Sequence, residues 1–197
     1  PNAQKLKCSA IYLAEGFGTA SQIVNLLDSL DTNSGSPCNS GNCSPTLTVM
    51  AELSFKNGNN ALEANRDKNL ALAEEAIATC SNTGFKSYVQ ISSIFKIGTM
   101  ATMQAYALRD LFPPMNPNDP ISVDEIKDAV AQLPPEELGQ IAFNTYHMVC
   151  VGNDSPSSAT QDYCDELQKS LNNYGNNYSS IGQCLIQLLQ DSQAVCN

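Results

Sequence analysis

The stretch from Lys86 to Phe112 carries one charged side chain, Lys96, between Ser87 and Leu108. Its apolar residues fall on nearly every side when it is placed on a helix with about 3.6 residues per turn. A helix that is apolar all round belongs inside a protein, because none of its faces suits water. We therefore expect one long core helix over residues 86–112, with the other segments packed around it.

The same stretch has the length of a membrane span, but polar residues interrupt it too often for hydrocarbon. These residues are Gln90, Ser92, Ser93, Lys96, Thr99, Thr102 and Gln104. We therefore expect no transmembrane segment. The helix should end before Pro113 and Pro114, because proline lacks a backbone N–H and disfavours helical backbone in the residue before it.

Apolar spacing predicts further helices on both sides of this one. They are expected over residues 4–30, 45–55, 60–80, 122–133, 135–149, 159–171 and 180–195. Residues 47–55 also alternate between apolar and polar side chains, so a strand is the alternative there. The predicted fold class is all-α, a disulfide-stapled bundle of seven to eight helices around the central helix.

Local signals support several of these helix starts. Ser122 and Glu125 form a capping box, in which each side chain bonds a free backbone N–H of the first turn. Asn60 and Glu63 resemble a second capping box. Pro135 suits the first position of a helix because its missing N–H is not needed there.

The chain has 197 residues, of which 42% are hydrophobic, and this fits one large domain. We expect a single helical domain over residues 1–197, and we allow for a looser N-terminal part over residues 1–58. In the first helix, Leu6, Ala10 and Leu13 are among the apolar positions expected to be buried. Gly16 and Gly18 each cost about 1 kcal/mol relative to alanine, so a kink or a tight helix crossing is expected there.

The charge balance limits the partners of this chain. Ten Lys and Arg residues against twenty Asp and Glu residues give a net charge of −10, which repels nucleic acid and anionic membranes. Charged residues make up only 15% of the chain, so much of the surface consists of uncharged polar groups. Such a surface tolerates the close approach of another protein.

Several features predict a secreted, extracellular protein. The chain begins with Pro rather than Met, which fits removal of a signal peptide. Two N-x-Ser sequons make Asn42 and Asn177 candidate glycosylation sites. An even number of scattered cysteines predicts disulfides rather than free thiols. The eight are Cys8, Cys38, Cys43, Cys80, Cys150, Cys164, Cys184 and Cys196.

Geometry restricts how these cysteines can pair. If one helix is continuous to the end of the chain, Cys184 and Cys196 lie about 18 Å apart, which is beyond the reach of a disulfide. We therefore expect each of them to pair elsewhere. The expected local bridges are Cys150–Cys164 and Cys38–Cys43, which leaves Cys8, Cys80, Cys184 and Cys196 for long-range links.

No residue pattern predicts catalysis. The single histidine, His147, lies among apolar residues and is expected to be structural, and oxidised cysteines leave no nucleophile. The turn that begins at Gly16 lacks the third glycine of a dinucleotide-binding site. The acidic residues near helix starts suit the helix dipole better than acid–base chemistry. These are Asp124, Glu125, Asp128, Glu136 and Glu137.

The segment with Asp28, Asp31, Asn33 and Gly35 misses the spacing of a calcium-binding loop, and no glutamate closes it. We expect neither a metal nor a cofactor, and we expect the protein not to be an enzyme.

A set of flexible and aromatic side chains on the core helix is a candidate lining for an apolar ligand pocket: Phe95, Met100, Met103 and Tyr106. Thioethers adapt to irregular ligands, although the same residues are also typical of ordinary core packing. Two functions remain. The first is a non-catalytic structural or interaction protein that self-associates or binds another extracellular protein. The alternative is a secreted carrier of a lipid or sterol.

Overall fold

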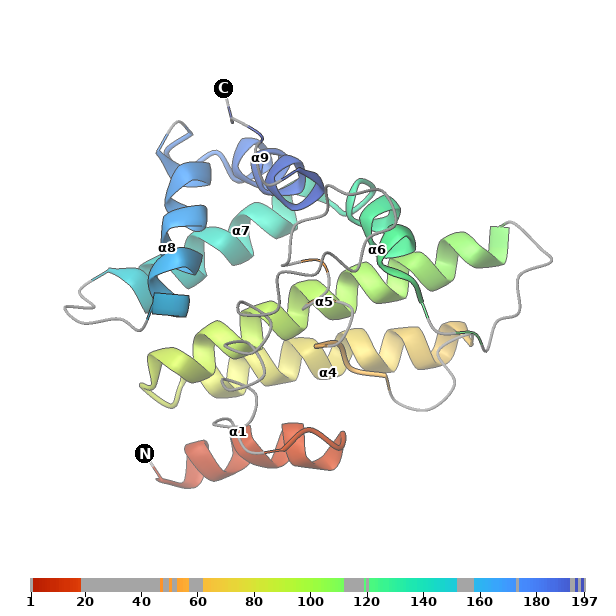
Figure 1. The fold of residues 1–197 in the computed structure, drawn as a ribbon. Helices are drawn as coiled ribbons and strands as arrows, with labels where there is room; N and C mark the ends of the chain where they lie inside the picture. Colours follow the sequence, from red (N-terminus) through yellow and green to blue (C-terminus); the bar gives the residue numbers. More distant parts are fainter. Residues whose placement is uncertain are drawn as a thin grey trace.

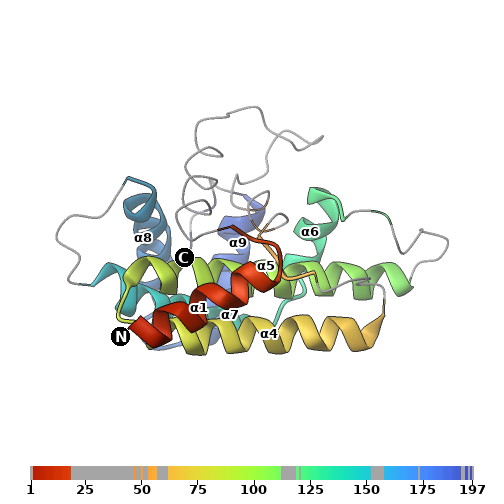
Figure 2. The ribbon, with the colours of Figure 1, turned by 90° about the horizontal axis from the view of Figure 1, so that it is seen from below.

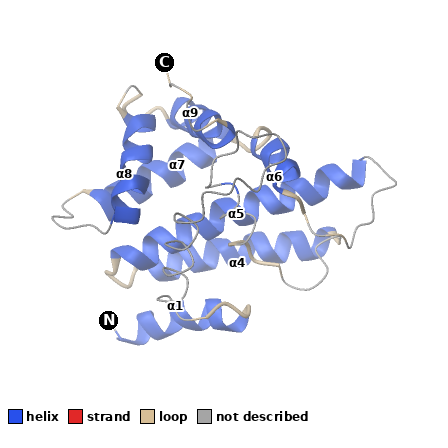
Figure 3. Cartoon of the chain, in the orientation of Figure 1, coloured by secondary structure: helices blue, strands red, loops and turns tan. Residues whose placement is uncertain are grey.

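The structure is a computed structural model of the chain, and it describes residues 2–18, 47, 50, 53–56, 62–111, 119, 121–151, 158–172, 174–191, 194 and 196. Within these residues the fold is all-α, as predicted, with no strand (Figure 3). The α-helices are α1 (Asn2–Ala14), α4 (Glu63–Ser81), α5 (Lys86–Leu111), α6 (Val123–Val130), α7 (Pro135–Thr145), α8 (Ser158–Leu171) and α9 (Tyr178–Gln190). A π-helical turn, η1 (Tyr146–Cys150), directly follows α7.

The longest helix, α5, corresponds to the predicted core helix and has nearly the expected bounds. Every residue from Tyr88 to Met103 is buried, whereas Leu111 in the last turn is 70% exposed. Helix α5 contacts α4, α6, α7 and η1. Figure 1 shows α4 along one side of it and α6 and α7 on the other. Helix α1 packs on α4, and Figure 2 shows the two side by side.

Two of the polar residues that interrupt α5 form hydrogen bonds with other helices. Tyr12 in α1 donates a hydrogen bond to the Ser92 hydroxyl, with an O···O distance of 2.7 Å. The Ser93 and Thr145 hydroxyls lie 2.6 Å apart across the contact between α5 and α7. Buried hydroxyls are costly unless they are hydrogen-bonded, so these pairs fix which faces of the neighbouring helices meet α5.

Two disulfides agree with the expectations. Cys8 and Cys80, which are 72 positions apart, join α1 to α4 with a Cα–Cα distance of 5.1 Å. Cys150 and Cys164 join η1 to α8 with a Cα–Cα distance of 5.6 Å, which matches the expected local bridge. The other expected local bridge, Cys38–Cys43, lies outside the described residues.

The expectation that Cys184 and Cys196 pair elsewhere is wrong. They form a disulfide with each other, and their Cα atoms are 5.3 Å apart. The last helix does not continue to residue 195 but ends at Gln190, where Asp191 adopts an extended conformation (φ −146°, ψ 108°). The chain can therefore return to α9, and the distance argument, which assumed one continuous helix, does not apply.

Two expectations for the first helices also need correction. Helix α1 ends at Ala14, and Gly16 adopts the left-handed conformation with φ of +83°, so the helix stops where a kink was expected. Helix α4 has Leu62, not Asn60, at its N-cap, without a side-chain hydrogen bond. Leu62 itself is 59% exposed. Residues 19–30 lie outside the described part of the chain.

Residues 45–55, for which the sequence predicted a helix with a strand as the alternative, are described only in part. Leu47 and Met50 are helical and buried, which favours the helix over the strand at these two positions. Residues 53–55 are not helical, so the helix does not extend to Phe55 as expected. The helix starts farther along the chain agree with the sequence. Ser122 and Glu125 form the predicted capping box of α6, and Pro135 occupies the first turn of α7.

Helices α7 and α9 pack more extensively than any other described pair. Two glycines make this close approach possible. A Cβ atom on Gly139 would lie 1.8 Å from the carbonyl oxygen of Tyr178, and one on Gly182 would lie 1.7 Å from that of Pro135. Both neighbours are backbone atoms, which cannot rotate away. The crossing therefore depends on the absence of side chains at these positions.

We predict that Gly139→Ala or Gly182→Ala destabilises the protein by about 2 kcal/mol, a typical overpacking cost. In an ordinary helix the same change would instead stabilise by about 1 kcal/mol, so the sign of the effect is diagnostic. Urea unfolding followed by circular dichroism measures the change. The exposed neighbour Gln183→Ala is the control, and a stabilised glycine variant would contradict the close crossing.

Candidate functional site

The outer face of α1 carries an exposed row of apolar side chains. Ala3, Leu6, Ala10 and Leu13 are all exposed, and the two leucines are 71% and 55% exposed. At about 100° per residue, Leu6 and Leu13 lie about 20° apart around the helix and roughly 150° from Cys8. We call these four residues the α1 seam. It faces away from the protein body, whereas Cys8 and Tyr12 are buried.

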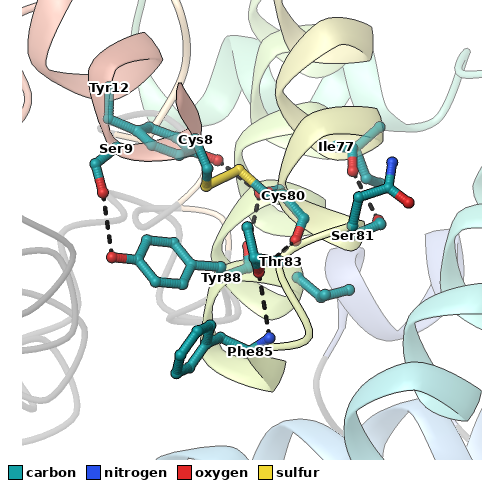
Figure 4. Close-up of a disulfide and its surroundings, with 12 residues drawn as sticks. Cys8, Ser9, Tyr12, Ile77, Cys80, Ser81, Thr83, Phe85 and Tyr88 are labelled. Carbon is teal, nitrogen blue, oxygen red and sulfur yellow. Dashed lines mark hydrogen bonds between the residues drawn. A yellow bond between two sulfur atoms is a disulfide. The ribbon is translucent and has the colours of Figure 1, made fainter. Parts of the chain in front are cut away.

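Helix α1 is held to the protein body along its inner face (Figure 4). The Cys8–Cys80 disulfide joins it to α4, and the hydroxyls of Ser9 and Tyr88 lie 3.1 Å apart. Tyr12 also bonds Ser92 on α5, and burial raises the pKa of Tyr12 well above its usual value. The α1 seam therefore has a fixed orientation.

The charge of α1 is opposite to that of the whole chain. Residues 2–14 include Lys5 and Lys7 and no acidic residue, whereas the chain has a net charge of −10. Lys5 Nζ lies 4.6 Å from the centre of the Phe85 ring, and Lys7 Nζ lies 3.6 Å from Glu75 Oε1 at an exposed site. Helix α1 itself thus carries two positive charges, one of which is paired with Glu75, and the next acidic residue along the chain is Glu15, just after the helix.

A groove of about 390 Å³ lies between α4, α5 and the start of α7. We call it the α4–α5 groove. Most of its exposed lining is apolar, and it includes two thioethers. The apolar lining residues include Leu70, Ala73, Met100, Met103, Ala107 and Leu133.

Charged side chains surround this apolar floor. Lys96, a buried residue of α5, pairs with Glu74 on α4 and with Glu137 on α7, so it bridges one end of the groove. The charged lining residues are Glu63, Arg66, Asp67, Glu74, Lys96 and Glu137. Four carboxylates against two cations give the lining a net charge of −2.

The structure brings together only two of the four candidate ligand-pocket residues. Met100 and Met103 line the α4–α5 groove. Phe95 packs elsewhere, with its ring 4.9 Å from that of Tyr12 in a separate aromatic cluster. Tyr106 lies beside Arg109 instead, 5.8 Å from its guanidinium. Because α5 is buried on several sides, residues that share one apolar pattern in the sequence contact different neighbouring elements.

The remaining candidate residues have local roles. Asn177 is exposed, and its side chain accepts a hydrogen bond from the Ser180 backbone at the N-cap of α9. The other candidate glycosylation site, Asn42, lies outside the described residues. His147, expected among apolar neighbours, is exposed in η1, although its ring centre lies 4.4 Å from that of Phe143.

One of the acidic residues near helix starts has a strongly shifted pKa. The Arg109 guanidinium donates to both carboxylate oxygens of Glu125, with one N···O distance of 2.8 Å. This hydrogen bonding lowers the pKa of Glu125 from 4.5 to about 2. The Ser122 backbone and hydroxyl also donate to it, so Glu125 both caps α6 and fixes α5 beside it.

The α1 seam was not predicted from the sequence. Leu6, Ala10 and Leu13 were expected to be buried because they share helical spacing, yet the buried face contains Cys8 and Tyr12. Cys8 was the available signal, because a disulfide must face the protein body. Of the groove, the sequence indicated the two methionines but not their charged surroundings.

The described residues contain neither a candidate membrane span nor a candidate metal site. None of the helices that the structure describes has the combined length and hydropathy of a membrane span. In the same part of the chain, no three His, Cys, Asp or Glu side chains are grouped so that they could hold a metal ion. Comparisons of the sequence with protein family models and curated proteins, and of the fold with solved structures, gave no match.

We predict that Glu125→Gln weakens the acid sensitivity of folding. Because the pKa of Glu125 is lower in the folded protein, the carboxylate stabilises the fold above about pH 4.5 and loses this effect as the pH falls toward 2. The variant should be less stable by about 1 kcal/mol at pH 7, allowing for partial exposure, and more nearly equal to the parent at pH 2. Urea unfolding at several pH values measures this.

The control for this experiment is Glu136→Gln, which removes an exposed acid from the first turn of α7. It should change the pH dependence less. A parallel pH profile for the parent and Glu125→Gln would contradict the assigned ion pair.

Proposed function

We propose that this chain is a secreted, non-catalytic protein, a disulfide-stapled helical bundle around α5, that self-associates into a larger extracellular assembly. The α1 seam is the observation that carries the proposal. Single exposed leucines are common on protein surfaces. A regular apolar row on a helix that is covalently fixed to the body is a less ordinary feature, because it offers a rigid surface to a partner.

The disulfides support the extracellular part of the proposal. Three described disulfides link α1 to α4, η1 to α8, and α9 to the residues after it. Such bonds persist in oxidising compartments and are rare in the cytosol. They also restrict the unfolded chain, which suits a protein that must last outside a cell.

The non-catalytic part rests on the roles of the ionisable groups. Glu125 is engaged by Arg109 and by the N-cap of α6. His147 is exposed beside aromatic rings. Catalytic groups usually lie in a cleft with a base or acid within hydrogen-bond reach. Neither residue lines the α4–α5 groove, and Glu137, which does, is paired with Lys96.

We predict that Leu6→Glu/Leu13→Glu prevents self-association, because it removes the apolar contact and places two charges in it. The parent should form species larger than a monomer in sedimentation velocity at increasing concentration, and the variant should stay monomeric. Both positions are exposed, so the fold should be retained, which circular dichroism checks.

The matched control is Gln168→Glu/Gln187→Glu, which adds the same two charges at exposed positions of α8 and α9. It should assemble like the parent. A parent that remains monomeric at high concentration, without filaments in electron micrographs, would refute the proposed self-association.

The α4–α5 groove favours a second candidate function, a carrier of an apolar small molecule. Its volume of about 390 Å³ and its thioether lining suit a small ligand with an apolar body. In that case, native mass spectrometry of the purified protein should show a bound mass that organic extraction removes. Filling the groove by Ala107→Phe should reduce the bound fraction, and the absence of any bound mass would count against a carrier.

A further inference from the structure

We propose that the α1 seam of one copy docks into the α4–α5 groove of the next copy. This inference rests on the proposed self-association and specifies its two surfaces. The contact is heterologous, because each copy contributes a different surface to it. The argument combines the anchoring of α1, the charges of the two surfaces and their shapes.

The seam cannot reach the groove of its own chain. Cys8 is bonded to Cys80 near the end of α4, whereas the groove lies over the first half of that helix. Cys80 and Leu70, a residue of the groove floor, are about 15 Å apart along the helix axis. The seam also faces away from the protein body. Only the groove of another copy is therefore available to it.

Charge favours the groove over a second α1. If two α1 helices paired through their seams, two helices that each carry two lysines and no acidic residue would be brought together, which is unfavourable. The groove lining has four carboxylates against two cations. A helix with two lysines and no acid is thus attracted to it, although the chain as a whole is acidic and repels its own copies.

The shapes of the two surfaces also correspond. Helices bind grooves through apolar side chains at positions i, i+4 and i+7, and Leu6, Ala10 and Leu13 have this spacing. The groove offers Met100 and Met103 at its floor, and thioethers adjust to the side chains that enter. The exposed carboxylates of Glu63 and Asp67 supply negative charge on the α4 side of the groove, which attracts the positively charged α1.

A heterologous contact leaves one free seam and one free groove at the two ends of every oligomer. Copies then continue to add until the chain of copies closes into a ring or grows as a filament. An isologous contact between two identical seams would instead stop at a dimer. The two arrangements differ in a way that mixing experiments can detect.

The test mixes two defective variants of the full chain. Leu6→Glu/Leu13→Glu disables the seam and leaves the groove intact. Glu63→Lys/Asp67→Lys inverts the charge of the groove at two exposed positions and leaves the seam intact. Each variant alone should be monomeric. An equimolar mixture should form a dimer of one copy of each, because one working seam and one working groove are present, and growth should stop there.

The readout is native mass spectrometry, which resolves the two variants by mass, together with sedimentation velocity. The matched control, Asp128→Lys/Asp165→Lys, makes the same charge change at exposed positions outside the groove and should assemble alone like the parent. Gln104→Lys, which also lines the groove, provides a second groove variant and should weaken association at least tenfold. Circular dichroism verifies that each variant is folded.

Several results would overturn the docking inference while leaving self-association intact. One is a groove variant that assembles like the parent, and another is a mixture that stays monomeric under conditions in which the parent assembles. A parent dimer that does not grow with concentration would indicate isologous pairing. A small molecule bound to a monomeric parent would instead identify the groove as a ligand site, and self-association would be refuted with it.

Discussion

The burial of α5 is the constraint on which the other contacts depend. A helix that is buried at every position from Tyr88 to Met103 has no face left for solvent. Some of its polar side chains are also bonded to groups of other elements. Ser92 is paired with Tyr12 of α1, and Ser93 is paired with Thr145 of α7. Because such bonds are costly to leave unmade inside a protein, the polar groups of α5 select the faces that its neighbours present.

Lys96 shows that the burial of α5 also affects residues at the protein surface. A buried ammonium group is unfavourable unless it is paired, and Glu74 and Glu137 reach it from α4 and α7. The same two carboxylates form part of the acidic lining of the α4–α5 groove. The two carboxylates that pair with Lys96, the one lysine in an otherwise uncharged stretch, thus also contribute negative charge to the candidate binding surface.

The sequence predicted the elements better than their partners. Proline and capping residues act within a few positions, so the end of α5 and the start of α6 at Ser122 could be predicted closely. The pairing of Cys184 with Cys196 could not, because it depends on the end of α9 at Gln190, which no local signal marks. The close contact of Gly139 and Gly182 was likewise not predicted, since it depends on two segments meeting in space.

The orientation of the first helix could not be predicted from the sequence for the same reason. Its leucines and its cysteine lie on opposite faces, and which face is buried depends on Cys80, 72 positions away. This bond has a consequence for timing. While both thiols are still reduced, only non-covalent contacts hold the N-terminal helix in place. The row of leucines is then held less firmly, and in the proposed secreted assembly, oxidation of this cysteine pair would be the step that fixes its direction toward a neighbouring copy.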